Sequence, residues 1–210
     1  MYHIVWVVIF VLVVSFLSNV SPFTGASYTL LATLQLTFLG FTPFNFLTIV
    51  LISAIGATMA KVVVYYGAFG FRGFLLRNKN VRLIGQSSKS EKFYLVLFLA
   101  ALLPVFPFDD YIYIGAGATS ASLGLMSLVT LSAKFVKSGV EVALEFTILR
   151  DLAATFGYHS LDLTIALTAA FIVIGIVVYQ VDWEATYRKL WKGQKAGTAD
   201  SGPVDPAKPL

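Results

Sequence analysis

The sequence predicts an all-α polytopic membrane protein with about four transmembrane helices and two opposed re-entrant hairpins arranged as an inverted repeat. Three observations carry this prediction. Only 12% of the 210 residues are charged and 58% are hydrophobic, whereas a typical soluble domain has about twice that charged fraction. The basic residues gather in one internal segment and in the tail. Two segments combine proline with polar residues inside otherwise apolar sequence.

Four apolar runs are expected to cross the bilayer: residues 4–20, 43–70, 122–149 and 161–182. A short polar loop is expected between the last two, around residues 150–160. For the first run, the alternative is a cleaved signal peptide. That would require a basic segment before the apolar run and a small-residue cleavage site, and only His3 precedes the run. We therefore expect a retained first helix.

Topology follows from charge. Residues 71–92, which we expect to form a loop, hold six basic residues and a single acid, Glu91, and the tail is also basic. Both regions should be cytoplasmic by the positive-inside rule, so an even number of crossings must separate them. Three apolar segments lie between them, so one must enter and leave on the same side. The stretch LLPVFPFDDYIYIGAGA, residues 102–118, is the best candidate because proline breaks a helix.

Two re-entrant hairpins are therefore expected, at residues 22–42 and 93–121. The sequence SPFTGASYTLLAT of the first echoes FPFDDYIYIGAGA of the second, which suggests an inverted repeat. Backbone that is not helical at membrane depth must be covered by protein or line a wet cavity. The residues expected to interrupt the helices are Pro22, Pro104, Pro107, Gly115 and Gly117. The glycines of GAGA also allow close helix packing.

Residues 1–182 are thus expected to form one membrane domain, followed by a cytoplasmic tail at 183–210. Trp183, Tyr187 and Trp191 recur every four residues beside basic side chains, which suits a short helix at the lipid headgroups. The remainder of the tail has the composition of a disordered segment. We expect a prokaryotic cell membrane protein, with both termini in the cytoplasm, that forms homo-oligomers.

Charged residues occur inside the expected span 122–149. Lys134, Lys137, Glu141 and Glu145 fall within an arc of roughly 80° on a helix. Each charge at the bilayer centre costs at least ~3 kcal/mol. The four charges therefore must pair with other charges or line a wet cavity.

The expected partners of these charges lie on neighbouring segments. They are Lys61 in the span 43–70 and the adjacent Asp109 and Asp110 in the second hairpin. In a purely structural interpretation, the two aspartates lie in an ordinary water-exposed turn, and the four charges of the span 122–149 form salt bridges that only stabilise the fold. The functional reading, which we favour, is a polar cavity that handles a charged substrate or a proton, because ionisable residues inside a membrane usually mark function.

Two stretches resemble the DedA family, also called the VTT or SNARE-associated Golgi protein family, over roughly residues 20–150. ISAIGATMAKVVVYYGAFGFRG, residues 52–73, is similar to the family's small-residue and Gly-Asp stretch followed by Tyr-x-x-Gly-Arg. PVFPFDDYIYIGAGA, residues 104–118, is similar to its Arg-Phe-x-Pro-x-x-Arg motif with an Ala-Gly pair. The resemblance implies two facing re-entrant hairpins, and links the chain to lipid scrambling, polyprenyl-phosphate recycling and proton-dependent transport.

The charges of this sequence depart from the family pattern. Lys61 stands where the family has an acid, and Asp110 stands where it has the arginine after Pro-x-x. The arginine before the first proline of the motif falls at Pro104, and PFTGAS lacks the glutamate of the first hairpin. In this register the resemblance implies an acid–base pair whose signs are exchanged between the two segments.

The expected function is transport or scrambling of an anionic lipid, either a phospholipid or a polyprenyl phosphate. Lys61, Lys134 and Lys137 would bind the phosphate. Asp109, Asp110, Glu141 and Glu145 would balance the lysines and could carry protons, because burial favours a neutral carboxyl group. The alternatives are an ion- or proton-coupled transporter of a small solute and a non-transporting membrane scaffold.

Other classes find little support in the sequence. No Walker loop, nucleophile elbow or metal-ligand spacing is visible, and cysteine is absent. We therefore expect no enzyme activity, no metal and no cofactor. The basic segment is better explained by topology and anionic lipid headgroups than by nucleic acid, so membrane lipids are the expected partners.

Overall fold

The structure, a computed structural model, describes residues 2–20, 28–88, 90–103, 108–157 and 159–180. These residues form helices joined by turns, and no strand occurs among them. The all-α class is therefore as predicted. The helices are α1 (Tyr2–Val20), α2 (Tyr28–Leu39), α3 (Pro43–Gly70), α4 (Arg72–Leu75), α5 (Lys79–Ser87), α6 (Glu91–Leu102), α7 (Phe108–Ala118), α8 (Leu123–Phe156) and α9 (Ser160–Gln180).

The chain divides into two units, Met1–Gly175 and Ile176–Leu210. Of the second unit, the structure describes only residues 176–180, the end of α9. The expected interfacial helix and tail at 183–210 lie outside the described residues. The packing of α1 to α8 belongs entirely to the first unit.

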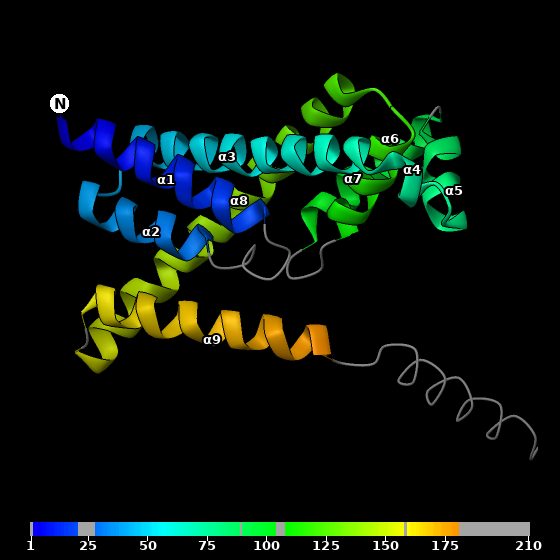
Figure 1. Cartoon of the computed structure of the whole chain (residues 1–210). Coiled ribbons are helices and arrows are strands. Elements are labelled where there is room, and N and C mark those ends of the chain that lie inside the picture. Colours follow the sequence, from blue (N-terminus) through cyan, green and yellow to red (C-terminus); the bar gives the residue numbers. More distant parts are fainter. Residues whose placement is uncertain (1, 21–27, 89, 104–107, 158, 181–210) are drawn as a thin grey trace, which may run out of the picture. The chain divides into compact units, whose positions relative to one another are not determined.

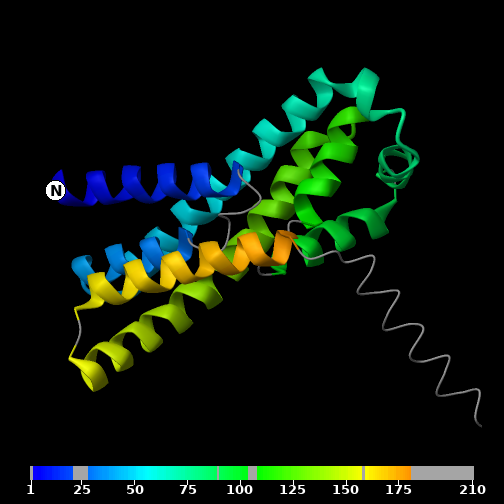
Figure 2. The ribbon, with the colours of Figure 1, turned by 60° about the horizontal axis from the view of Figure 1, so that its bottom comes forward.

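Helices α3 and α8 form the centre of the first unit and pack against each other. Helices α1 and α7 pack on α3, whereas α2 and α6 pack on α8 (Figures 1 and 2). Two apolar clusters result. The first joins α1, α2, α3 and α8, and the second joins α3, α6, α7 and α8. Their buried members include Val11, Leu36, Ile49 and Val142 in the first and Tyr65, Leu97, Tyr113 and Met126 in the second.

Helix α3 has the bounds that the sequence predicts for its span. Thr42 caps its first turn, because the Thr42 Oγ1 accepts a hydrogen bond from the Asn45 N–H at 3.1 Å. Pro43 follows at the first helical position, where its fixed φ suits a helix and its missing N–H costs nothing. The cap and the proline together account for the start of the helix.

Helix α8 is longer than the expected span 122–149. It continues through leucine and alanine, which favour helix, and ends at Gly157. Gly157 adopts the left-handed conformation, with φ of 70°, and its N–H bonds to the Ala153 carbonyl. Most of the polar loop expected at residues 150–160 is therefore helical.

The segment 71–92, expected as a loop, contains α4, α5 and the first two residues of α6. Asn78 caps α5 by accepting from the Asn80 N–H at 2.8 Å, and Ser90 caps α6 by accepting from the Lys92 N–H at 3.3 Å. Helix-capping side chains thus organise a segment whose charge density suggested a loop.

The two expected hairpins are described only in part. Helix α2 lies within the first expected segment, and α6 and α7 lie within the second. Pro22, Pro104 and Pro107 lie outside the described residues.

The expectation that Gly115 and Gly117 interrupt a helix is wrong, because both lie within α7. Their role is close packing, as the GAGA sequence also suggested. A Cβ atom on Gly117 would collide with the backbone carbonyl oxygen of Tyr65 on α3. A Cβ on Gly115 would lie 2.6 Å from the Ile84 side chain of α5. Only glycine permits both approaches.

Polar and apolar side chains occupy unusual positions on the two central helices. On α8, Lys134 and Lys137 are buried, while Leu128 and Leu144 are 60% and 58% exposed. On α3, Lys61 is buried, while Tyr66 is 60% exposed. Among the described helices, α3 and α8 are also long and apolar enough to cross a membrane. These features fit a helical membrane protein.

Candidate functional site

Four buried charges meet where α3, α7 and α8 come together. The Lys61 Nζ lies 2.6 Å from the Asp110 Oδ1 and 3.5 Å from the Asp109 Oδ2. The Lys134 Nζ lies 2.9 Å from the same Asp109 oxygen. Asp109 thus bridges the two lysines, and Asp110 pairs with Lys61. We call these four residues the charge cluster.

The four members of the charge cluster come from three helices. Asp109 and Asp110 occupy the first turn of α7, where the helix dipole favours negative side chains. Lys61 lies in the second half of α3 and also donates to the Asn19 carbonyl at the end of α1, at 3.4 Å. Lys134 lies near the middle of α8. The cluster therefore links four helices.

The side chains of the charge cluster are almost fully buried, and their formal charges sum to zero. Lys61, Asp109, Asp110 and Lys134 are 2%, 3%, 8% and 4% exposed. A buried ion loses several kcal/mol of hydration, which only close pairing and hydrogen bonds can offset. Two lysines against two aspartates satisfy that requirement. The expected pairing of a charge of α8 with an aspartate is confirmed for Lys134 and Asp109, and the Lys61–Asp110 pair that the resemblance implied is also present.

A second ion pair follows one turn along α8. The Lys137 Nζ lies 3.8 Å from the Glu141 Oε1 and donates to the Leu103 carbonyl at the end of α6, at 3.3 Å. The Glu141 Oε2 is buried and has no hydrogen-bond partner among the described residues. This is the loosest of the ion pairs formed by the described buried lysines.

Glu145, the last charge of the α8 stripe, pairs with hydroxyl groups instead of lysines. Its Oε1 accepts from Thr29 at 2.7 Å and its Oε2 accepts from Thr33 at 2.8 Å. Both threonines are buried on α2. Nearby, the Tyr28 hydroxyl lies within hydrogen-bond distance of the Ser138 Oγ on α8, at 3.0 Å. The polar stripe of α8 thus continues from the charge cluster to α2.

Sequence reasoning missed the α2 part of this polar stripe. Thr29 and Thr33 are four residues apart, so they share one face of a helix. That spacing could have predicted a polar face on this segment. The polar residues of 22–42 were interpreted only as signs of a hairpin. No metal site accompanies these carboxylates: within the described ranges, no three His, Asp or Glu side chains could hold an ion together.

We expect Thr33→Val to lower the free energy of unfolding by about 1.5 kcal/mol, because one oxygen of a buried carboxylate loses its donor. Thr37→Val is the matched control. Thr37 is exposed, and among the described residues its hydroxyl donates to the Thr33 carbonyl of its own helix. Thermal unfolding of the detergent-solubilised protein compares the two. Equal effects would show that the bond to Glu145 contributes nothing.

Comparisons of the chain with family models, with curated proteins and with solved structures find no match.

Proposed function

We propose that this protein is an integral membrane transporter or scramblase that moves an anionic lipid, a phospholipid or a polyprenyl phosphate, past its buried charges. One observation carries the proposal. The same two helices, α3 and α8, bury lysines and expose leucine, valine and aromatic side chains. Apolar side chains on the outer surface suit contact with lipid, and buried charged side chains suit a polar path through the interior. The proposed site residues are the seven charged groups of the interior.

The chemistry suits a phosphate group. The proposed phosphate ligands are Lys61, Lys134 and Lys137, each a compact charge with three donors. An incoming phosphate brings negative charge into an interior whose cluster lysines are already balanced by carboxylates. Uptake of a proton by one of these carboxylates would keep the interior neutral, which is the proposed basis of proton coupling. The wide Lys137–Glu141 pair is the first that an anion would open.

An inverted repeat with two re-entrant hairpins belongs to the proposal. Its support is the pattern of helix contacts: α1 and α7 pack on α3 as α6 and α2 pack on α8. Exchanging α1 with α6, α2 with α7 and α3 with α8 leaves these four contacts unchanged, whereas the additional packing of α2 on α3 has no comparably close counterpart between α7 and α8. Such repeats are common in transporters that bind their substrate at mid-membrane.

We also propose that the chain is a distant member of the DedA family. When this sequence is matched to the family's motifs, Lys61 and Asp110 fall at the positions of an acid–base pair in the family, with the two signs exchanged. The two side chains lie 2.6 Å apart, which supports this match. On this proposal the protein is a homo-oligomer of the prokaryotic cell membrane, with residues 71–92 and both termini in the cytoplasm.

A structural role is the second candidate, because every lysine of the charge cluster already has a carboxylate partner. In that case, neutralising Lys61 and Asp110 together would restore whatever the single changes damage. In a transporter, the double variant would fold and fail to move lipid.

The proposal is tested by fluorescent-lipid movement in proteoliposomes. We expect wild type to move anionic lipid, and Lys134→Ala and Asp110→Asn to slow the movement at least about tenfold, equivalent to ~1.4 kcal/mol in the barrier. Lys137→Gln should do the same with less risk to folding, because its ion pair is wide. Lys92→Gln, on an exposed lysine, is the control.

Two outcomes would contradict lipid transport. One is a wild-type rate in folded Lys134→Ala and Lys137→Gln proteins. The other is the absence of movement of any anionic lipid by wild type under any pH gradient. The second outcome would favour a small-solute transporter or a scaffold.

A further inference from the structure

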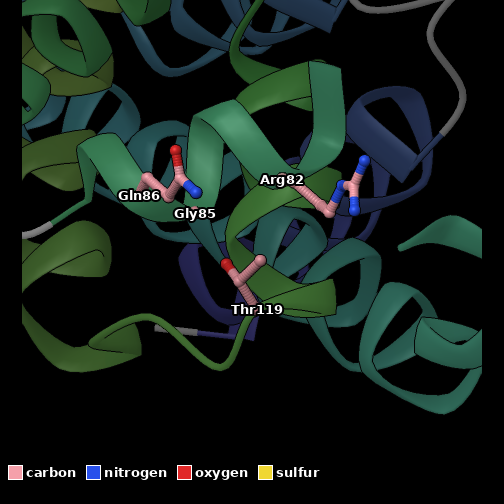
Figure 3. A pocket seen from close by; sticks show the side chains of 4 residues that line it. All are labelled: Arg82, Gly85, Gln86 and Thr119. Atoms are coloured by element: carbon pink, nitrogen blue, oxygen red, sulfur yellow. The ribbon is translucent and has the colours of Figure 1, made fainter. Parts of the chain in front are cut away.

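An open hollow lies between α5 and the end of α7, away from the charge cluster. Its volume is about 390 Å³, and it is lined by Arg82, Gly85, Gln86 and Thr119 (Figure 3). Arg82 and Gln86 extend from α5, and Thr119 points toward α5 from just beyond α7. A Cβ on Gly85 would collide with the Thr119 side chain. Gly85 therefore brings the two segments into close contact at the base of the hollow.

The two faces of α5 have different surroundings. Ile84 lies against Gly115 of α7, so that face is anchored to the protein. Lys79, Arg82, Leu83 and Gln86 are exposed and fall within an arc of about 100° on the opposite face. A leucine among basic and amide side chains is typical of a helix that lies at the headgroup level of a membrane.

The Arg82 side chain is not engaged elsewhere. It forms no hydrogen bond or ion pair with any residue that the structure describes, whereas Arg72 stacks over the Phe69 ring at 4.9 Å. Thr119 is held in place, because its hydroxyl donates to the Gly115 carbonyl at 2.9 Å. The hollow thus combines an available guanidinium, an amide and a fixed hydroxyl oxygen.

The segment that carries α5 is basic and apolar at once. The sequence of residues 71–92 holds six basic residues and a single acid. Phe71 and Phe74 are 72% and 74% exposed. Cations alone would suit any phosphate compound, whereas exposed aromatic rings beside them suit a lipid surface.

We propose that this hollow binds the phosphate headgroup of an anionic phospholipid in the leaflet that faces α4 and α5. Arg82 holds two phosphate oxygens with its planar fork, and Gln86 donates its amide to the headgroup. Phe71, Phe74 and Leu83 enter the interface between headgroups and acyl chains. The inference rests on the membrane location in the proposed function, but not on transport.

The test is native mass spectrometry of the full chain in detergent, titrated with phosphatidylglycerol or phosphatidylcholine. We expect wild type to retain phosphatidylglycerol in preference to phosphatidylcholine. Arg82→Gln should weaken that retention about tenfold, because a charged, bidentate contact is lost. Arg72→Gln removes the same charge from the same segment without touching the hollow, and should weaken it less than about threefold.

Equal losses in Arg82→Gln and Arg72→Gln would indicate diffuse attraction and overturn the site. Displacement of phosphatidylglycerol by an equal concentration of glycerol phosphate would assign the hollow to a free phosphate compound and overturn the lipid assignment. Lipid-movement assays separate the two proposals. Arg82-dependent retention by a protein that moves no lipid would support the hollow and contradict transport. Lipid movement without such retention would do the opposite.

Discussion

Lys61→Met is expected to lower the free energy of unfolding by about 3–5 kcal/mol, because it leaves a buried carboxylate without its cation. Asp110 loses the partner at 2.6 Å, while Asp109 keeps Lys134 at 2.9 Å. The measurement is thermal or chemical unfolding of the detergent-solubilised protein. Lys92→Met, on an exposed lysine of the basic segment, should change the stability by less than about 0.5 kcal/mol.

The double variant Lys61→Met, Asp110→Asn isolates the ion pair. It removes both charges together, so most of the lost stability should return. Exchanging the two charges, with Lys61→Asp and Asp110→Lys, should likewise fold better than Lys61→Asp alone. If the double variants were as unstable as the sum of the single ones, the Lys61–Asp110 contact would not contribute to stability.

Gly117→Ala is expected to lower the free energy of unfolding by about 3 kcal/mol, the upper part of the range for overpacking. The added Cβ would collide with the Tyr65 carbonyl oxygen. A backbone atom cannot rotate away, so α7 must move from α3 and shift the two aspartates of its first turn. Reduced lipid movement should accompany the lost stability, because Asp109 and Asp110 would leave Lys61.

Gly67→Ala is the matched control, because Gly67 lies in α3 with nothing within 4 Å of a Cβ atom. Alanine favours a helix over glycine by about 1 kcal/mol, so this variant should be as stable as wild type or more stable. Thermal unfolding of both variants under the same conditions makes the comparison. A Gly117→Ala protein as stable as Gly67→Ala would contradict the close approach of α7 to α3.

The features predicted well from the sequence are local ones. The bounds of α3 were predicted from a long apolar run. The polar stripe of α8 follows from helical periodicity: Lys134 and Lys137 are buried on it, while the exposed Leu125 and Leu128 lie on the opposite side of the helix. A buried partner of opposite sign for the charges of α8 could be anticipated because buried charges require pairing, and Asp109 is that partner for Lys134.

The features missed depend on contacts between distant segments. Glu145 was expected to balance a lysine, yet it accepts from Thr29, 116 residues away in sequence. Gly115 and Gly117 were expected to interrupt a helix. Their role in close packing depends on the neighbouring helix that each one contacts, and the local sequence does not identify that neighbour. Residues 71–92 were expected as a loop because of their many charges. The capping residues Asn78 and Ser90 in the same segment were overlooked.

Composition and periodicity act within a few turns of helix, so they were enough to predict the helical class, the two long central helices and the buried charged face of α8. Which charges share a partner, and where a hollow lies between α5 and α7, depends on how distant helices pack. The physical reason is that a side chain's partner depends on the close packing of helices, and the approach of α7 to α3 and α5 is set by two glycines whose neighbours lie far away in the chain.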